Sequence, residues 1–211
     1  SCEDNNVGYF SAKNCEKIIE RFDWVDAIAI GPGLGPNEET IKFVEKLVSA
    51  SNKPLVIDAD GLRPFMGNNK LFEEITVPFV ITPHYGEFCR ITAADSKTIE
   101  SEFASVVTDF MTDFNGILVA KNAPSCIFYK NISVVNSTGN PALATAGTGD
   151  VLTGMIAGLI AQGLEPSNAA QTAVYIHGKA ADFFCEKKGM RGMIASDLLN
   201  TIPTVFNDYE G

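Results

Sequence analysis

Residues 137–164, STGNPALATAGTGDVLTGMIAGLIAQGL, decide the fold, because a glycine-rich loop runs directly into a long apolar segment. Small residues in this loop let the backbone approach a ligand closely. They are Ala146, Gly147, Thr148 and Gly149. The apolar segment predicts a buried helix, whose first amide groups lack intrahelical partners and carry the positive end of the helix dipole. This combination is typical of a phosphate-binding loop.

Asp150 stands between the loop and the apolar segment. Bound phosphates repel a carboxylate, so an acid at this place points to proton transfer or metal binding at a reacting centre. The alternative is an ordinary Asp at a helix start, which interacts favourably with the dipole and has no chemical task. The loop alone leaves both interpretations open.

Length and charge narrow the class of protein. The 211 residues are enough for one α/β domain with a single large core. The 16 basic and 26 acidic residues give a net charge of −10 without long runs of either sign. This charge argues against a nucleic-acid or anionic-membrane surface and favours small-molecule ligands. A phosphate-bearing ligand must then be held by local donors or by Mg²⁺.

The cysteines and histidines give no sign of a transition-metal site, and we assign no metal ligand. The five cysteines lack CxxC spacing, which favours reduced thiols and a cytoplasmic protein. They are Cys2, Cys15, Cys89, Cys126 and Cys185. The two histidines show no HExxH spacing.

Neither a membrane span nor a secretory signal is expected in these residues. The longest apolar stretch, residues 151–164, is short and interrupted by glycine and polar residues, which predicts a buried helix. Residues 1–10 lack a basic region followed by an apolar core.

Short β-rich runs alternate with longer segments of helical period, which predicts a parallel sheet with crossover helices. Expected strands are Ala27–Ile30, Leu55–Ile57, Phe79–Ile81 and Ile117–Val119, followed by an antiparallel hairpin of Cys126–Tyr129 and Ile132–Val135. Expected helices cover residues 38–49, 85–91, 96–114, 151–162, 167–187 and 196–208. Ser167 and Ser196 are the expected N-caps of the last two helices, and Pro203 is an expected kink.

Glycine-rich or polar segments follow each expected parallel strand. Ligands of such sheets bind beyond the carboxyl ends of the strands, so these segments should meet at one edge. They are GPGLG at Gly31–Gly35, DADGL at Asp58–Leu62, TPHYGE at Thr82–Glu87 and KNAPS at Lys121–Ser125, with the glycine-rich loop as the fifth.

The first two segments each have a structural interpretation beside the functional one. GPGLG either allows close backbone approach to a ligand or forms a plain tight turn. Asp58 and Asp60 either bind Mg²⁺ or cap a helix that begins near Leu62, and we expect at least one of them to be a cap.

Three basic side chains could bind a ligand, and we expect a different role for each of them. His84 lies at a strand-to-helix turn, where its ring can donate to a phosphate or polar substrate, and we favour that role. Lys121 follows a strand directly, where its ammonium group can meet nucleotide phosphates, although most lysines are simply solvated. His177 lies in a helical segment, and we expect it to face the core with a hydrogen bond and without a functional role.

Taken in order, GPGLG, DADGL, TPHYGE and NPALATAGTGDVLTG resemble the ADP- or ATP-dependent NAD(P)H-hydrate dehydratases of the ribokinase-like superfamily. The last motif, residues 140–154, is the most specific, and the resemblance continues to Ala195–Leu199. It implies a three-layer α/β/α fold over residues 1–211, a single domain with a mainly parallel sheet and helices on both faces. It also implies a further strand and helix before residue 7, which this sequence does not contain.

The resemblance implies repair of damaged nicotinamide cofactors. The substrates (S)-NADHX and (S)-NADPHX would be dehydrated to NADH and NADPH while ADP or ATP is hydrolysed with the help of Mg²⁺. Asp150 would be the base on the ring hydroxyl and a substrate contact. The implied nucleotide-binding residues are Lys121, Asn122, Ala123, Pro124, Ser125, Gly147, Thr148 and Gly149. The implied substrate-binding residues are Gly33, Gly35 and His84, with support from Asp58, Asp60 and Asn140. Family members are commonly tetramers, so we expect a homo-oligomer.

Four positions depart from the family pattern. Ala142 replaces the usual Gly after Asn-Pro, and Tyr85 replaces the Pro that follows His84. In the KNAPS segment, Asn122 and Ser125 replace Gly and Thr. Ser125 keeps the hydroxyl group of Thr. The motifs TPH and NPALATAGTGD resemble those of the ADP-using branch of the family.

Two other functions remain open. A ribokinase-like kinase would use the same loop and Asp150 to phosphorylate a stable alcohol, although the NPALAT sequence before the loop disfavours it. A catalytically inactive nucleotide sensor would bind ADP without turnover.

Overall fold

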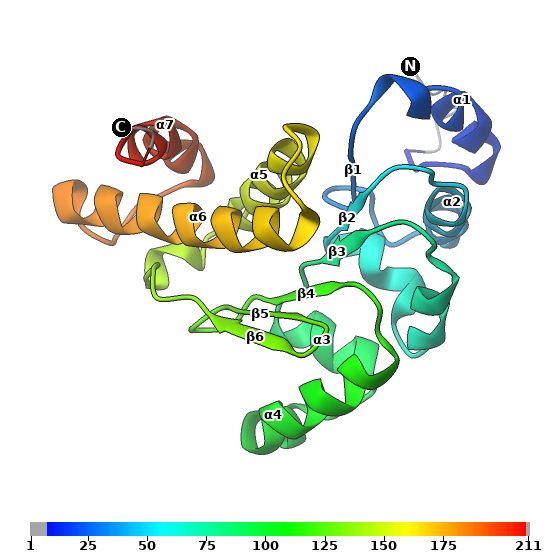
Figure 1. Ribbon diagram of the computed structural model, residues 1–211, viewed down its shortest axis with the longest axis horizontal. Coiled ribbons are helices and arrows are strands. Elements are labelled where there is room, and N and C mark those ends of the chain that lie inside the picture. Colours follow the sequence, from blue (N-terminus) through cyan, green and yellow to red (C-terminus); the bar gives the residue numbers. More distant parts are fainter. Residues whose placement is uncertain (1–7, 210–211) are drawn as a thin grey trace.

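The computed structural model describes residues 8–209 and shows a sheet between two layers of helices (Figure 1). Residues 1–7 lie outside the described residues, and with them Cys2 and most of the segment that we tested for a secretory signal. The sheet has six strands in the order β1-β2-β3-β4-β5-β6. The strands are β1 Ile28–Ile30, β2 Leu55–Ile57, β3 Phe79–Ile81, β4 Ile117–Ala120, β5 Cys126–Tyr129 and β6 Ile132–Val135.

The strand pairing confirms the predicted topology. The first four strands are parallel, and β4, β5 and β6 pair antiparallel. The expected strand at Ala27 begins one residue later, and the strand expected to end at Val119 continues through Ala120.

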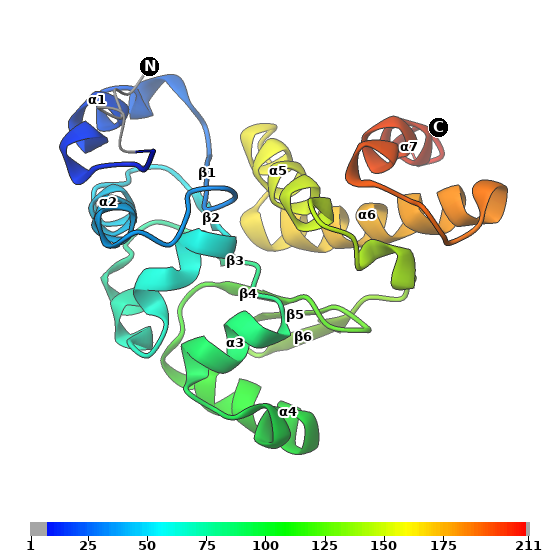
Figure 2. The same ribbon diagram turned by 180° about the vertical axis from the view of Figure 1, so that it is seen from behind.

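Helices cover both faces of the sheet (Figure 2). On one side lie α2 Glu38–Ser49, α3 Tyr85–Thr92, α4 Ser96–Asp113 and the 3₁₀ segments η3 Ala59–Phe65 and η4 Asn69–Glu74. On the other side lie α5 Thr148–Ala161 and α6 Pro166–Lys188, with α7 Ala195–Asn207 packed on both. The remaining short elements are η1 Ala12–Asn14, α1 Cys15–Ile19, η2 Phe22–Trp24 and η5 Pro141–Leu143. This arrangement is the three-layer α/β/α fold that the sequence predicts.

Strand alternation divides the core into two parts. In β2, Leu55 and Ile57 join the cluster formed with α2, α3 and α4, whereas Val56 faces α5 and α6. In β3, Val80 likewise faces α5 and α6. Every side chain of β2 and β3 is buried, as expected of parallel strands that are covered on both faces.

Both predicted serine N-caps are wrong. Helix α6 begins at Pro166, one residue before Ser167, because proline is well suited to the first helical position. Helix α7 begins at Ala195, and the Asp197 carboxylate accepts a hydrogen bond from the Ile194 amide at 2.9 Å. Pro203 lies within α7.

Between residues 8 and 209, no helix is both long and apolar enough to cross a membrane. The apolar segment after Asp150 lies in α5, which packs on the sheet beside α6. Its interior side is apolar, with Leu152, Ile156 and Ile160 all buried.

Candidate active site

The segments that follow β1 to β4 meet at one edge of the sheet. The Gly35 amide donates to the Asp60 carboxylate at 2.9 Å, which joins GPGLG to DADGL. The Lys121 amide donates to the Pro83 carbonyl oxygen at 2.9 Å, and His84 pairs with Lys121 as a parallel bridge. The structure therefore brings together the segments that the sequence places after successive strands.

Glycine is required where the first two segments touch. Gly31 has a φ of 136°, and a Cβ atom there would lie 1.6 Å from the Asp58 carbonyl oxygen. A Cβ atom on Gly61 would lie 2.7 Å from the Ile30 carbonyl oxygen. By contrast, Gly33 and Gly35 have positive φ and open space where a Cβ atom would lie, which leaves room for a ligand, and the Gly35 amide is held by Asp60.

The prediction that Asp58 or Asp60 caps a helix is wrong. The Asp60 carboxylate binds the Gly35 amide and the Arg63 Nε, the latter at 2.6 Å. Asp58 precedes η3 without capping it. Instead, the Asp58 carboxylate accepts from Lys121 Nζ and from Thr153 Oγ1, each at 2.7 Å.

The start of α5 differs from the prediction in a way that matters for the site. The helix begins at Thr148, three residues before the expected position, with Gly147 as its N-cap at a φ of 88°. Gly149 and Asp150 therefore belong to the first helical turn, where amide groups lack intrahelical partners. Asp150 is exposed at this turn.

Contacts from neighbouring segments hold this turn in place. Thr148 Oγ1 donates to the carbonyl oxygens of Leu143 and Thr145, at 2.7 and 2.8 Å. The Thr148 carbonyl oxygen lies 2.9 Å from His177 Nε2 on α6. The loop before α5 is thus fixed on both sides before any ligand binds.

His177 is buried, hydrogen-bonded and neutral. The pKa of His177 is lowered to about 4, because burial lowers it more than the hydrogen bond to Thr148 raises it, and the nearby Lys121 charge adds to the lowering. In the neutral ring, Nε2 must carry the proton that is donated to the Thr148 carbonyl oxygen. The expected core position of His177 is confirmed.

Asn140 connects the segment before the glycine-rich loop to α6. Its side chain accepts from the Ala142 amide at 3.0 Å and donates to the Asp182 carboxylate on α6 at 2.9 Å. The same carboxylate accepts from the Gly139 amide at 2.9 Å. Asp182 was not predicted, because nothing in its local sequence distinguishes it from a solvated helix residue.

His84 has a local role that the sequence did not reveal. Its Nδ1 accepts from the Gly86 amide at 3.0 Å, and its own amide donates to Glu87 at 2.8 Å, which forms a capping box at the start of α3. Because Nδ1 is an acceptor, Nε2 carries the proton of the neutral ring. The side chain is 54% exposed at the edge of the sheet, and its Nε2 lies 3.4 Å from Glu87 Oε1.

The KNAPS turn connects β4 to β5. Ser125 Oγ donates to the Asn122 carbonyl oxygen at 3.2 Å, and the Ser125 carbonyl oxygen accepts from the Asn136 amide at 2.9 Å. Ala123 and Pro124 are exposed at the tip of the turn. Lys121 stands at its beginning, and its ammonium group reaches back to Asp58.

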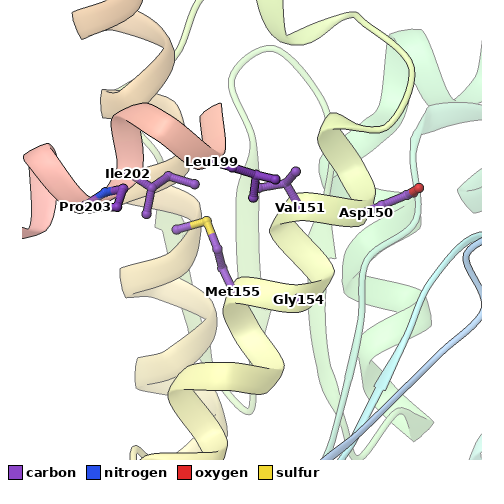
Figure 3. Close-up of a pocket in the computed structure, with 7 residues that line it drawn as sticks. All are labelled: Asp150, Val151, Gly154, Met155, Leu199, Ile202 and Pro203. Atoms are coloured by element: carbon purple, nitrogen blue, oxygen red, sulfur yellow. The ribbon is translucent and has the colours of Figure 1, made fainter. Parts of the chain in front are cut away.

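A pocket of about 470 Å³ lies between α5 and α7, close to the start of α5 (Figure 3). Its lining is mostly apolar and consists of Asp150, Val151, Gly154, Met155, Leu199, Ile202 and Pro203. Figure 3 shows the Asp150 carboxylate pointing away from the apolar members of this set. The Asp150 carboxylate therefore does not point into the apolar part of this pocket.

The described residues offer no ready-made metal cage. In residues 8–209, no three His, Cys, Asp or Glu side chains meet in a way that would hold an ion. Both oxygens of Asp58 are already occupied by Lys121 and Thr153.

The fold and this edge define a class of protein: an α/β domain of the ribokinase-like type. A solved ribokinase-like superfamily protein from Enterococcus faecalis V583 superposes with a TM-score of 0.78 and 25% identity, over 95% of this chain and 69% of that chain.

The chain belongs to the NAD(P)H-hydrate dehydratase family, whose model matches residues 2–204. The ADP/ATP-dependent NAD(P)H-hydrate dehydratase of Bacillus subtilis, crystallised with ATP/Mg²⁺, has a TM-score of 0.76 and 29% identity, covering 87% of this chain and 66% of that chain.

Curated relatives carry the same family name but are longer. A bifunctional NAD(P)H-hydrate repair enzyme Nnr from Moorella thermoacetica is 36% identical over 211 residues, which is 100% of this chain and 40% of that protein. The Salinibacter ruber protein of the same name is 40% identical over 192 residues, covering 90% of this chain and 35% of that protein. The chain thus spans about two fifths of the length of these relatives.

Proposed function

We propose that this chain dehydrates (S)-NADHX and (S)-NADPHX to NADH and NADPH at the expense of ADP or ATP. One observation carries the proposal. The exposed Asp150 carboxylate lies in the first turn of α5, beside helix-start amides that favour phosphate, and the neighbouring Gly149 lies next to the Lys121 ammonium group. A base and a phosphate site therefore share one helical turn.

The chemistry explains why a nucleotide is consumed. Hydroxide is a poor leaving group near neutral pH, so direct loss of the ring hydroxyl is slow. Asp150 would accept the hydroxyl proton while the hydroxyl oxygen attacks the terminal phosphoryl group, and AMP or ADP would leave. Loss of the phosphate together with a proton from the adjacent ring carbon then restores the dihydropyridine.

The remaining predicted residues divide between the two substrates. The backbone of Gly147–Gly149 would cradle the transferring phosphoryl group, and Lys121–Ser125 would hold the nucleotide. Gly33 and Gly35, which have open surroundings, and the exposed His84 side chain would contact NAD(P)HX. Asn140 would support the loop through Asp182.

The proposal also includes Mg²⁺, a cytoplasmic location and a homo-oligomer, with a tetramer as the family resemblance implies. Mg²⁺ would neutralise nucleotide phosphates in a protein whose net charge is −10. In the described part of the chain, Cys89, Cys126 and Cys185 carry free thiols, which supports a reducing compartment.

An assay with two kinds of acceptor separates this function from a kinase or a sensor. The protein is incubated with NADHX and ADP or ATP, and the absorbance of the restored dihydropyridine is followed. In parallel, it is incubated with ATP and stable alcohols such as hydroxymethylpyrimidine or a sugar. We expect turnover of NADHX only; phosphorylation of an alcohol alone would indicate a kinase, and ADP binding without any turnover a sensor.

A further inference from the structure

Asp58, Lys121 and Thr153 form a buried polar group of three beneath the first turns of α5, and we name it the Lys121 clamp. Lys121 Nζ and Thr153 Oγ1 each donate to Asp58 at 2.7 Å. Asp58 is 1% exposed and the Lys121 side chain 20% exposed. The three residues come from the end of β2, the end of β4 and the body of α5.

The clamp lies directly against the proposed phosphate loop. A Cβ atom on Gly149 would lie 3.3 Å from Lys121 Nζ and 3.8 Å from Asp58 Oδ2. The glycine therefore leaves room for an ammonium group at the amide-rich start of the helix. An ammonium group at this place adds positive charge where the helix start already favours an anion.

The geometry also explains how a carboxylate can lie under a phosphate site. A buried, unpaired Asp58 would repel nucleotide phosphates, but here each oxygen is bound by a donor. Burial of an ion pair generally contributes little to stability, because desolvation offsets the attraction. A role in positioning is therefore a better reason for the pair than stability alone.

We propose that Asp58 and Thr153 are positioning residues that hold the Lys121 ammonium group beneath the nucleotide phosphates. Thr153 couples this clamp to α5, so the ammonium group and the helix-start amides keep a fixed separation. The inference rests on the proposed function for its substrate, a nucleoside di- or triphosphate. It assigns tasks to two residues that do not themselves touch the ligand.

Variants that keep the shape of the Thr153 or Asp58 side chain but remove its hydroxyl group or its charge test this proposal. Thr153→Val removes the hydroxyl at nearly constant volume, and Thr153→Ser restores it as the matched control. We expect Thr153→Val to weaken ADP binding, measured by calorimetry, by about tenfold. The KM for ADP should rise in parallel while the KM for NADHX stays within about twofold, and Thr153→Ser should bind ADP like the wild type.

A double-mutant cycle then shows whether Asp58 acts through Lys121. Asp58→Asn should weaken ADP binding in the wild-type background and have no further effect in Lys121→Met. An equal effect of Asp58→Asn in both backgrounds, or wild-type ADP binding by Thr153→Val, would overturn the clamp. If the wild type binds ADP but does not convert NADHX, the proposed function fails, and the calorimetric comparison still decides the clamp.

Discussion

Asp150 is the side chain on which the proposed chemistry depends. It is exposed in the first turn of α5, near the positive end of the helix dipole. An ionised carboxylate is the form that a general base requires. The same position would also suit an idle helix-start Asp, so activity must separate the two roles.

Asp150→Asn should lower the turnover of NADHX by about a thousandfold, because the amide cannot accept the hydroxyl proton. ADP binding should persist, since the helix-start amides and Lys121 remain. Steady-state kinetics and calorimetry measure the two effects. The matched control is Asp109→Asn, an exposed position on α4 across the sheet, which should leave turnover unchanged. Retention of most activity by Asp150→Asn would remove Asp150 from the mechanism.

His177 gives the chain a specific pH dependence of stability. Its pKa falls from 6.5 in the unfolded chain to about 4 in the fold, so the unfolded state binds more protons between these values. The stability from the neutral ring is complete above pH 6.5 and is lost as the pH falls through 4. The loss is about 3 kcal/mol.

Urea unfolding of the wild type and His177→Gln between pH 7 and 4 isolates this effect, because other groups contribute to both proteins. The glutamine amide can still donate to the Thr148 carbonyl oxygen. We expect the difference in unfolding free energy between the two proteins to shift against the wild type as the pH falls. A difference independent of pH would mean that His177 is not held neutral.

Among the elements, α5 shows most clearly what local sequence can and cannot predict. The bounds of β2, β3, β5, β6 and α2 agree with the prediction, because their apolar period is a local property. The start of α5 was missed because Thr148, Gly149 and Asp150 resemble a loop in composition. Lys121 and Thr153, the partners of Asp58, lie 63 and 95 positions away from it in sequence, so no local pattern predicts these contacts.

Alanine substitutions at two glycines of α5 should have different effects on ADP affinity and on stability. Gly149→Ala places a methyl group 3.3 Å from Lys121 Nζ, so ADP affinity should fall several-fold as the ammonium group is displaced. Gly158→Ala meets nothing within 4 Å, so it should raise the unfolding free energy by about 0.5–1 kcal/mol without changing ADP affinity. Thermal unfolding and calorimetry check both variants. If the wild type and both variants bound ADP with equal affinity, Lys121 would not contribute to nucleotide binding.

Across the whole molecule, the parallel strand order brings dispersed segments to one edge. GPGLG, DADGL, TPHYGE and KNAPS are separated in sequence, yet hydrogen bonds or packing contacts join neighbouring segments. The general location of the site was predictable, because ligands of such sheets bind at the strand ends. The role of each residue within the site was not predictable, because the contacts of Asp58, Asp182 and His84 depend on residues that the fold brings to them.

A bound nucleotide should stabilise the molecule as a unit. A ligand that binds only the folded state at one hundred times its Kd raises the unfolding free energy by about 2.7 kcal/mol. We expect ADP to raise the midpoint of thermal unfolding in a concentration-dependent way, whereas adenosine at the same concentration should have a smaller effect. An absence of any shift with ADP and ATP would contradict a nucleotide site.

In the proposed mechanism, phosphoryl transfer and dehydration are coupled at one site. The most direct measurement is the ratio of AMP released to NADH formed when the protein is supplied with NADHX and ADP. We predict one AMP for each NADH, with neither product formed when the other substrate is omitted. AMP release without NADH, or NADH formation without nucleotide consumption, would contradict it.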